Sequence, residues 1–90
     1  MEPTTLQFRP MNSKLLKGCE AEMSFKANKR VSKSIMSSLA PEIKKDKGGI
    51  SETAEGFKIV LKHAEVGRLR ALVGSYLRLV NSTMKVLQGQ

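Results

Sequence analysis

The stretch VGRLRALVGSYLRLVNSTMKVLQ, residues 66–88, decides the fold of this chain. It occupies most of the last third of the sequence, from Glu65 to Gln90, and its apolar residues recur with a helical period. At about 100° per residue they cover roughly half of the helix circumference, whereas a helix lying on a sheet needs a stripe of only about 100°. The apolar positions are Val66, Leu69, Leu72, Val73, Tyr76, Leu77, Leu79, Val80, Met84, Val86 and Leu87.

So wide an apolar surface needs more than a sheet to cover it. Burying one Leu or Val side chain contributes about 1.5–3 kcal/mol, so leaving several of them in water is costly. We expect this helix to pack inward with one edge and to meet a second helix of the chain, or another protein, with the rest. The predicted sheet-facing positions are Leu69, Tyr76, Val80 and Leu87.

Two apolar flanks border those sheet-facing positions. One flank consists of Leu72, Leu79 and Val86, and the other consists of Val66, Leu77 and Met84. One flank should meet the first helix and the other a partner protein, and periodicity does not determine which. The predicted partner-binding face therefore draws on both flanks and comprises Leu72, Leu77, Leu79, Met84 and Val86.

Upstream of this helix, two segments alternate apolar and polar residues, which is typical of half-buried strands. The first runs from Lys17 to Ala27 and the second from Phe57 to His63. Ile50 to Glu55 is a weaker strand candidate, and Glu55-Gly56 is predicted to form a hairpin turn.

A helix is predicted between the first two strands, from apolar residues that recur every four positions: Val31, Ile35 and Leu39. Asn28 is a suitable N-cap for it. Pro41 disfavours helical geometry just before it, so we expect at most one more turn beyond that point. Lys44 to Gly49 is then predicted to be a charged loop.

These elements predict one α+β domain over residues 17–90 with the order β-α-β-β-α. We expect a three-stranded antiparallel sheet with both helices packed on one face and charges on the other. Residues 1–16 carry Pro3 and Pro10 and show no apolar period, so we expect a mobile N-terminal arm. The alternative is that Leu6 and Phe8 add a short edge strand to the sheet.

Charge and cysteine content limit the class of protein. Sixteen Lys and Arg against eight Asp and Glu give a net charge of +8, which favours polyanionic partners such as nucleic acid or an acidic protein surface. The single cysteine, Cys19, excludes an internal disulfide and fits a reducing compartment. No signal peptide and no membrane span is recognisable, so we expect a cytoplasmic protein with no membrane association.

Two groups of basic residues are candidate tRNA contacts. Arg70, Arg78 and Lys85 fall within about 80° of one another on the last helix and would suit a row of phosphates. Lys29, Arg30 and Lys33 start the first helix, where positive charge opposes the helix dipole. The alternative for both groups is an ordinary solvated surface.

No catalytic constellation is visible in the sequence. His63 is the only histidine, and one His with one Cys cannot build the usual four-ligand zinc site. No base is placed to activate a serine. Gly48-Gly49 precedes a strand, unlike a phosphate-binding loop, which follows one. We therefore expect a protein that is not an enzyme and has no cofactor, metal or small-molecule substrate of its own.

Two segments resemble a known family. They are SIMSSLAPEI, residues 34–43, and AEGFKIVLKHAEVGRLRALVGSYLRLV, residues 54–80. The second combines a hairpin strand, a short acidic link, and then Leu-Arg-Ala and Ser-Tyr-Leu one turn apart. Over residues 17–88 the chain resembles the small dimerisation subunit of the KEOPS/EKC complex, the Pcc family. Residues 1–16 have no counterpart in the family pattern.

This resemblance implies a non-catalytic homodimeric subunit of the complex that attaches a threonylcarbamoyl group to adenosine in tRNA. Family members dock their helices onto two helices of an ATPase-like catalytic subunit, and tRNA is reached through the complex. The dimer geometry stays open between pairing of edge strands and a helix-mediated interface.

The alternative function is a free-standing small basic RNA-binding module of the KH type. Its hallmark is a Gly-x-x-Gly loop between two adjacent helices, and the sequence has no such loop. Aromatic residues for base stacking are also few: Phe8, Phe25, Phe57 and Tyr76.

Overall fold

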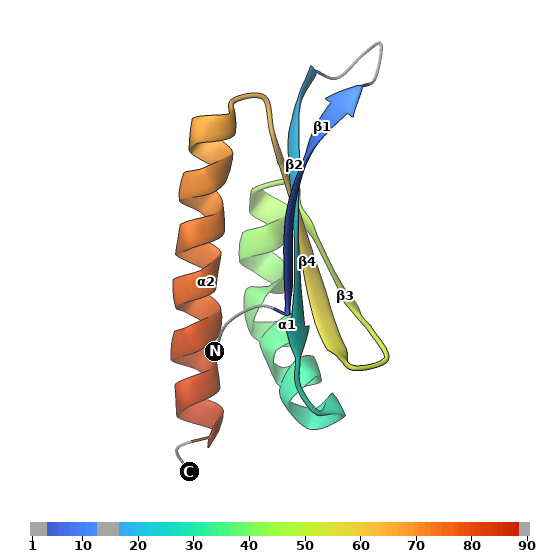
Figure 1. Ribbon diagram of the computed structural model, residues 1–90. Helices are drawn as coiled ribbons and strands as arrows, with labels where there is room; N and C mark the ends of the chain where they lie inside the picture. Colours follow the sequence, from blue (N-terminus) through green and yellow to red (C-terminus); the bar gives the residue numbers. More distant parts are fainter. Residues whose placement is uncertain (1–3, 13–16, 89–90) are drawn as a thin grey trace.

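A computed structural model describes residues 4–12 and 17–88 of the chain. Its four strands form one antiparallel sheet in the order β1-β2-β4-β3, and both helices lie on the same face of that sheet (Figure 1). The elements in chain order are β1 (Thr5–Asn12), β2 (Lys17–Lys26), α1 (Lys29–Lys45), β3 (Gly49–Glu52), β4 (Gly56–His63) and α2 (Val66–Gln88).

The α+β class is confirmed, but the prediction of three strands is wrong. Thr5–Asn12, which we expected within a mobile arm, forms β1 and pairs along its whole length with β2. The unpaired edge of β2 carries N–H and C=O groups that this preceding segment satisfies, with Leu6 opposite Met23 and Phe8 opposite Ala21. The edge-strand alternative is therefore the observed one. Residues 1–3 and 13–16 of the expected arm lie outside the described residues.

Strands β2 and β4 are the two central strands, and their alternation predicted their inward faces correctly. Phe25 lies opposite Phe57, with ring centroids 4.9 Å apart and nearly parallel planes. Met23 and Ala21 lie opposite Ile59 and Leu61 in the same register. All of these side chains are buried, so local periodicity determined which face of the sheet carries the core.

Helix α1 begins at the predicted cap and extends further than predicted. The Asn28 side chain accepts a hydrogen bond from the Val31 backbone N–H at 2.8 Å, as an N-cap does. The helix continues past Pro41 to Lys45. The predicted charged loop is therefore shorter than Lys44 to Gly49.

The C-terminal end of α1 has the hydrogen-bond pattern of a Schellman motif. The N–H of Gly48 donates to Ile43 O at 2.8 Å, and the N–H of Lys47 donates to Lys44 O at 3.1 Å. Lys47 adopts the left-handed conformation with φ 58°, at the position where helices usually have glycine. The glycine follows one residue later, because a Cβ at Gly48 would lie 2.6 Å from the Val60 carbonyl oxygen.

The predicted hairpin joins β3 to β4. The N–H of Thr53 donates to Gly56 O, and the Thr53 hydroxyl oxygen accepts from the Gly56 N–H. β3 ends at Glu52, earlier than the predicted Glu55, and the turn therefore lies over residues 53–55.

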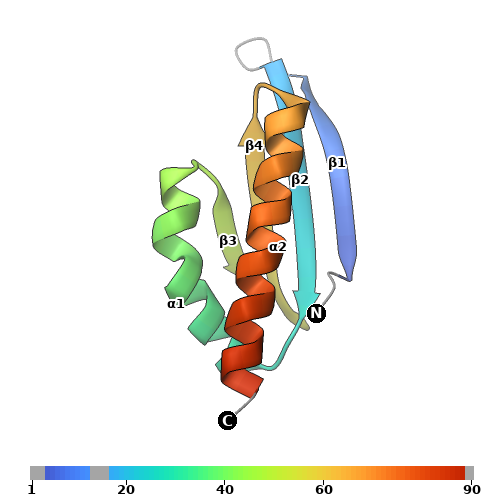
Figure 2. The same ribbon diagram turned by 90° about the vertical axis from the view of Figure 1, so that its left-hand side faces the viewer.

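The core lies between the sheet and the two helices. Helix α2 crosses β2 and β4, and α1 covers β3 and β4 beside it (Figure 2). β1 lies on the other side of α2 from α1, at an edge that no helix covers (Figure 2). The buried hydrophobic residues are Ala21, Met23, Phe25, Ile35, Leu39, Ile43, Phe57, Ile59, Leu61, Leu69, Val73, Tyr76, Val80 and Met84.

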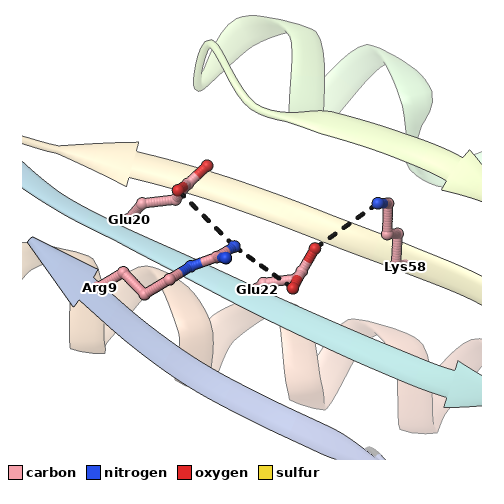
Figure 3. A network of polar contacts seen from close by, with 4 residues as sticks. All are labelled: Arg9, Glu20, Glu22 and Lys58. Atoms are coloured by element: carbon pink, nitrogen blue, oxygen red, sulfur yellow. Dashed lines mark hydrogen bonds and ion pairs between the residues drawn. The ribbon is translucent and has the colours of Figure 1, made fainter. Parts of the chain in front are cut away.

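The opposite face of the sheet is polar, as predicted, and carries an ion-pair network (Figure 3). Arg9 of β1 lies 3.3 Å from Glu22 and 3.8 Å from Glu20, both on β2. Lys58 of β4 lies 3.6 Å from the other oxygen of Glu22. Such partly exposed pairs contribute little each, but the network links three adjacent strands and marks this face as solvent-facing.

Candidate functional site

The exposed apolar surface of α2 lies on the flank formed by Leu72, Leu79 and Val86, here called the α2 stripe. Leu72 is half-buried, whereas Leu79 is 41% exposed and Val86 is 63% exposed. The three residues are seven apart, so they follow one line along the helix. Two residues of the α2 stripe, Leu79 and Val86, are thus in solvent, whereas Leu72 packs against the core.

The α2 stripe lies on the side of α2 that faces α1. Tyr76 lies between Leu72 and Leu79 on the helix surface, four residues after one and three before the other. The Tyr76 hydroxyl donates a hydrogen bond of 2.7 Å to the carboxylate of Asp46, which caps α1. This contact places that side of α2 toward α1.

The Tyr76 hydroxyl is held in its neutral form. Burial raises the pKa of Tyr76 well above its ordinary value, and the hydrogen bond to the Asp46 carboxylate raises it further. The bond therefore acts as a fixed structural link between α2 and the end of α1.

The second predicted flank does not form a surface. Met84 is buried in the core with 3% exposure, so its assignment to the partner-binding face is wrong. Leu77 is half-buried and packs against the core. Periodicity placed Met84 at the edge of the apolar arc, but the helix is rotated so that this edge faces the sheet.

Among the predicted sheet-facing residues, Leu69, Tyr76 and Val80 are buried as expected. Leu87 is not, because it lies in the last turn of α2, beyond Met84, the last α2 residue in the core. Val66, in the first turn, is likewise exposed.

All of the candidate tRNA-contacting residues are exposed, and they lie in two separate places. Arg70, Arg78 and Lys85 run along α2 over about 22 Å of helix. Lys29, Arg30 and Lys33 start α1, at the end of the molecule where α2 finishes (Figure 2). Of the α2 group, Lys85 in the last turn is therefore at the same end of the molecule as the α1 group.

A cleft that the sequence analysis missed lies at the opposite end of the molecule, and we call it the end cleft. It has a volume of about 680 Å³ and lies where α1 ends, β4 ends and α2 begins. It is lined by Lys45, Asp46, Lys47, Lys62, His63, Ala64, Arg68, Ala71, Leu72 and Ser75. The charged segment that begins at Lys44 was visible in the sequence. Only the fold brings it close to Lys62 and Arg68.

The lining of the end cleft is strongly basic. The lining includes four basic residues, Lys45, Lys47, Lys62 and Arg68, and the single carboxylate of Asp46. Because Lys62 lies opposite Glu20 in the sheet, its side chain belongs to the polar face, and the cations of the cleft itself are Lys45, Lys47 and Arg68. Asp46 already accepts the hydrogen bond of the Tyr76 hydroxyl. The Arg68 Nε lies 3.2 Å from the carboxylate of Glu65, but both side chains are largely exposed and such pairs exchange readily.

The helix-facing side of β1 is the third unoccupied surface. Leu6 and Phe8 point to the same side of the sheet as Met23 and Ala21, yet each is 42% exposed. Among the described residues, β1 contacts no element other than β2. Its outer edge therefore offers backbone hydrogen-bonding groups beside exposed apolar side chains.

His63 has a structural role at the end of β4. Its Nδ1 accepts a hydrogen bond of 3.0 Å from the Glu65 backbone N–H, which shapes the turn into α2. No three His, Cys, Asp or Glu residues in the described parts of the chain are grouped to hold a metal ion. No helix within residues 4–12 and 17–88 is long and apolar enough to cross a membrane.

Comparison of the chain with protein-family models, with curated proteins and with solved structures gave no match.

Proposed function

We propose that this chain is a non-catalytic, homodimeric assembly subunit of a KEOPS/EKC-type tRNA threonylcarbamoyladenosine complex. The observation that carries the proposal is the exposed α2 stripe, which lies on the side of α2 that faces α1, where both helices cover one face of a sheet. The resemblance of residues 34–43 and 54–80 to the Pcc family supports it.

The α2 stripe has the chemistry of a helix-docking surface. Leu79 and Val86 are large apolar side chains in solvent, on the α1 side of α2. An amphipathic helix packed beside α2 on its α1 side would cover them at i and i+7 positions and complete a helical bundle. We propose the helices of the ATPase-like catalytic subunit as the occupant, which the family resemblance implies.

The β1 edge is the surface that we assign to the second copy of the chain. Antiparallel pairing of two β1 strands would satisfy their free backbone groups and join the two sheets into one. It would also place Leu6 and Phe8 of each copy beside those of the other. Helix docking and dimerisation would thus use different surfaces and could occur together.

The docking assignment is tested by co-purification with the catalytic subunit. Leu79→Asp and Val86→Asp should each weaken the complex at least about tenfold, because each removes burial of about 1.5 kcal/mol or more and desolvates a charge. The matched control is Ser37→Asp, an exposed carboxylate introduced on α1. Thermal melts of the isolated variants would establish that each still folds.

If Leu79→Asp and Val86→Asp both co-purify as wild type does, the α2 stripe is not the docking surface and the proposal fails. The alternative, a free-standing RNA-binding module, is favoured by the basic end cleft. It predicts tight tRNA binding by the isolated protein at physiological salt with no protein partner, whereas an assembly subunit should bind weakly alone.

A further inference from the structure

The end cleft is a concave surface with more positive than negative side chains in its lining. Its cations come from two parts of the fold: Lys45 and Lys47 from the end of α1, and Arg68 from the first turn of α2. The three cations outnumber the Asp46 carboxylate in the lining, although Arg68 also pairs with Glu65 at 3.2 Å. The remaining positive charge favours an anionic ligand.

Lys47 provides an independent indication of function. It holds the left-handed position of the Schellman motif, where a side chain costs roughly 1–2 kcal/mol and glycine is usual. Glycine would also fulfil every backbone hydrogen bond of the motif. A lysine at a strained position that lines a basic cleft points to a use for its ammonium group.

We propose that the end cleft binds phosphate groups of an RNA backbone through Lys45, Lys47 and Arg68. Two of the three cations are lysines, whose compact ammonium groups suit phosphate oxygens without demanding one fixed geometry. The one ring in the cleft lining is the imidazole of His63, whose Nδ1 already accepts a hydrogen bond from the Glu65 N–H, and the cations are suited to phosphates, so we expect the contact to read the backbone and not the sequence. A volume of about 680 Å³ admits a short stretch of sugar and phosphate.

This inference deepens the proposed function and rests on it only for naming the RNA as tRNA. It also assigns the phosphate contacts to residues other than the candidate group at the start of α1. Lys29 and Lys33 lie near the beginning of α1, whereas the end cleft begins at its last residues, about 25 Å along the helix.

The test is RNA binding by the full-length protein, measured by fluorescence anisotropy with a labelled mixed-sequence single-stranded RNA and with unmodified tRNA. The cleft variant is Lys45→Glu with Lys47→Glu, and the control is Lys29→Glu with Lys33→Glu. Both pairs lower the net charge by four, from +8 to +4. At about 50 mM salt we expect the cleft pair to weaken binding at least tenfold and the control pair less than about threefold. The slope of log affinity against log salt should fall by about one for each phosphate that the variant no longer neutralises.

A Lys47→Gly variant separates a role in binding from a role in folding. Glycine relieves the left-handed strain, so this variant should melt at or above the wild-type temperature while binding RNA more weakly. A lower melting temperature with unchanged RNA binding would show that Lys47 serves the fold alone and would overturn its assignment.

Other outcomes also overturn the proposal. Equal weakening by the cleft and control pairs would mean that only net charge matters. Tighter binding of poly-glutamate than of RNA would assign the cleft to an acidic protein, and displacement of RNA by equimolar tripolyphosphate would assign it to a small phosphate compound. Because this test needs no catalytic subunit, its failure is distinguishable from failure of the co-purification test.

Discussion

Tyr76 is the residue that ties the two helices together. Its hydroxyl reaches the Asp46 carboxylate from a core position, so one hydrogen bond joins the middle of α2 to the end of α1. The same bond occupies the one carboxylate among the residues that line the end cleft. A single tyrosine therefore influences the packing of the helices and the charge of the cleft.

Removing that hydroxyl should destabilise the protein. Tyr76→Phe keeps the buried ring but loses a hydrogen bond to a charged acceptor, which we expect to lower the free energy of unfolding by about 1.5 kcal/mol. For a domain of this size that corresponds to roughly 6–12 °C in melting temperature. Urea unfolding followed by circular dichroism measures it. If Tyr76→Phe is as stable as wild type, the bond does not link the helices.

The same residue predicts how stability depends on alkaline pH. The raised pKa of Tyr76 means that the folded protein keeps a proton that the unfolded chain loses above about pH 10. The contribution of Tyr76 is therefore complete below about pH 10 and is lost progressively as the pH rises above it. Unfolding free energies at about pH 8, 10 and 11 should show the gap between wild type and Tyr76→Phe shrinking at the highest pH, and a gap that widens there would contradict this sign.

At the scale of elements, two glycines in different environments should respond oppositely to the same substitution. Gly74 lies inside α2, and a Cβ there would meet nothing within 4 Å. Gly56 starts β4 against β2, and a Cβ there would collide with the Phe25 carbonyl oxygen. Gly74 has room for a Cβ and a helical backbone. Gly56 has no room for one, and the atoms beside it are backbone atoms that cannot easily move.

Gly74→Ala should stabilise the protein by about 0.5–1 kcal/mol, because alanine restricts the unfolded chain and favours the helix. Gly56→Ala should destabilise it by about 1–3 kcal/mol through overpacking against backbone. Gly49→Ala, where a Cβ also has no neighbour within 4 Å, is the control in a strand. Thermal melts of the three variants measure these changes in stability. A Gly56→Ala protein as stable as wild type would mean that β2 and β4 are not as close as described.

At the scale of the whole molecule, the fold leaves three surfaces for partners. The α2 stripe, the β1 edge and the end cleft differ in chemistry, and they share only Leu72, which belongs to the stripe and also lines the cleft. One is apolar and helical, one is an open strand with two exposed apolar side chains, and one is basic and concave. This separation is what an assembly subunit with several partners requires.

Dimerisation should depend on the β1 edge. Phe8→Lys places a charge on the exposed apolar side of β1 and should reduce the mass of the protein in solution from twice the monomer mass to the monomer mass. Gln7→Lys is the matched control, because Gln7 lies on the other face of the same strand, opposite Glu22. Analytical ultracentrifugation over a concentration series measures both. A Phe8→Lys protein that stays dimeric would exclude the β1 edge as the interface.

Local patterns in the sequence determined much of this fold. The alternation in β2 and β4 identified their buried faces, Asn28 marked the start of α1, and the apolar arc of residues 66–88 predicted α2 and its excess of apolar surface. These features depend on neighbours within a few residues, and periodicity records them directly.

Tertiary structure decided what depends on distant parts of the chain. Leu6 and Phe8 belong to a strand because the edge of β2 is free to pair, and the segment itself gave no strong sign of it. Met84 is buried while Leu79 is not because the position of the sheet and α1 sets the rotation of α2. The end cleft exists because the ends of three elements meet at one place and bring the cations of α1 and α2 together. A helical or alternating pattern in the sequence indicates which residues share a face. Only the packing of elements far apart in the chain determines which face is covered.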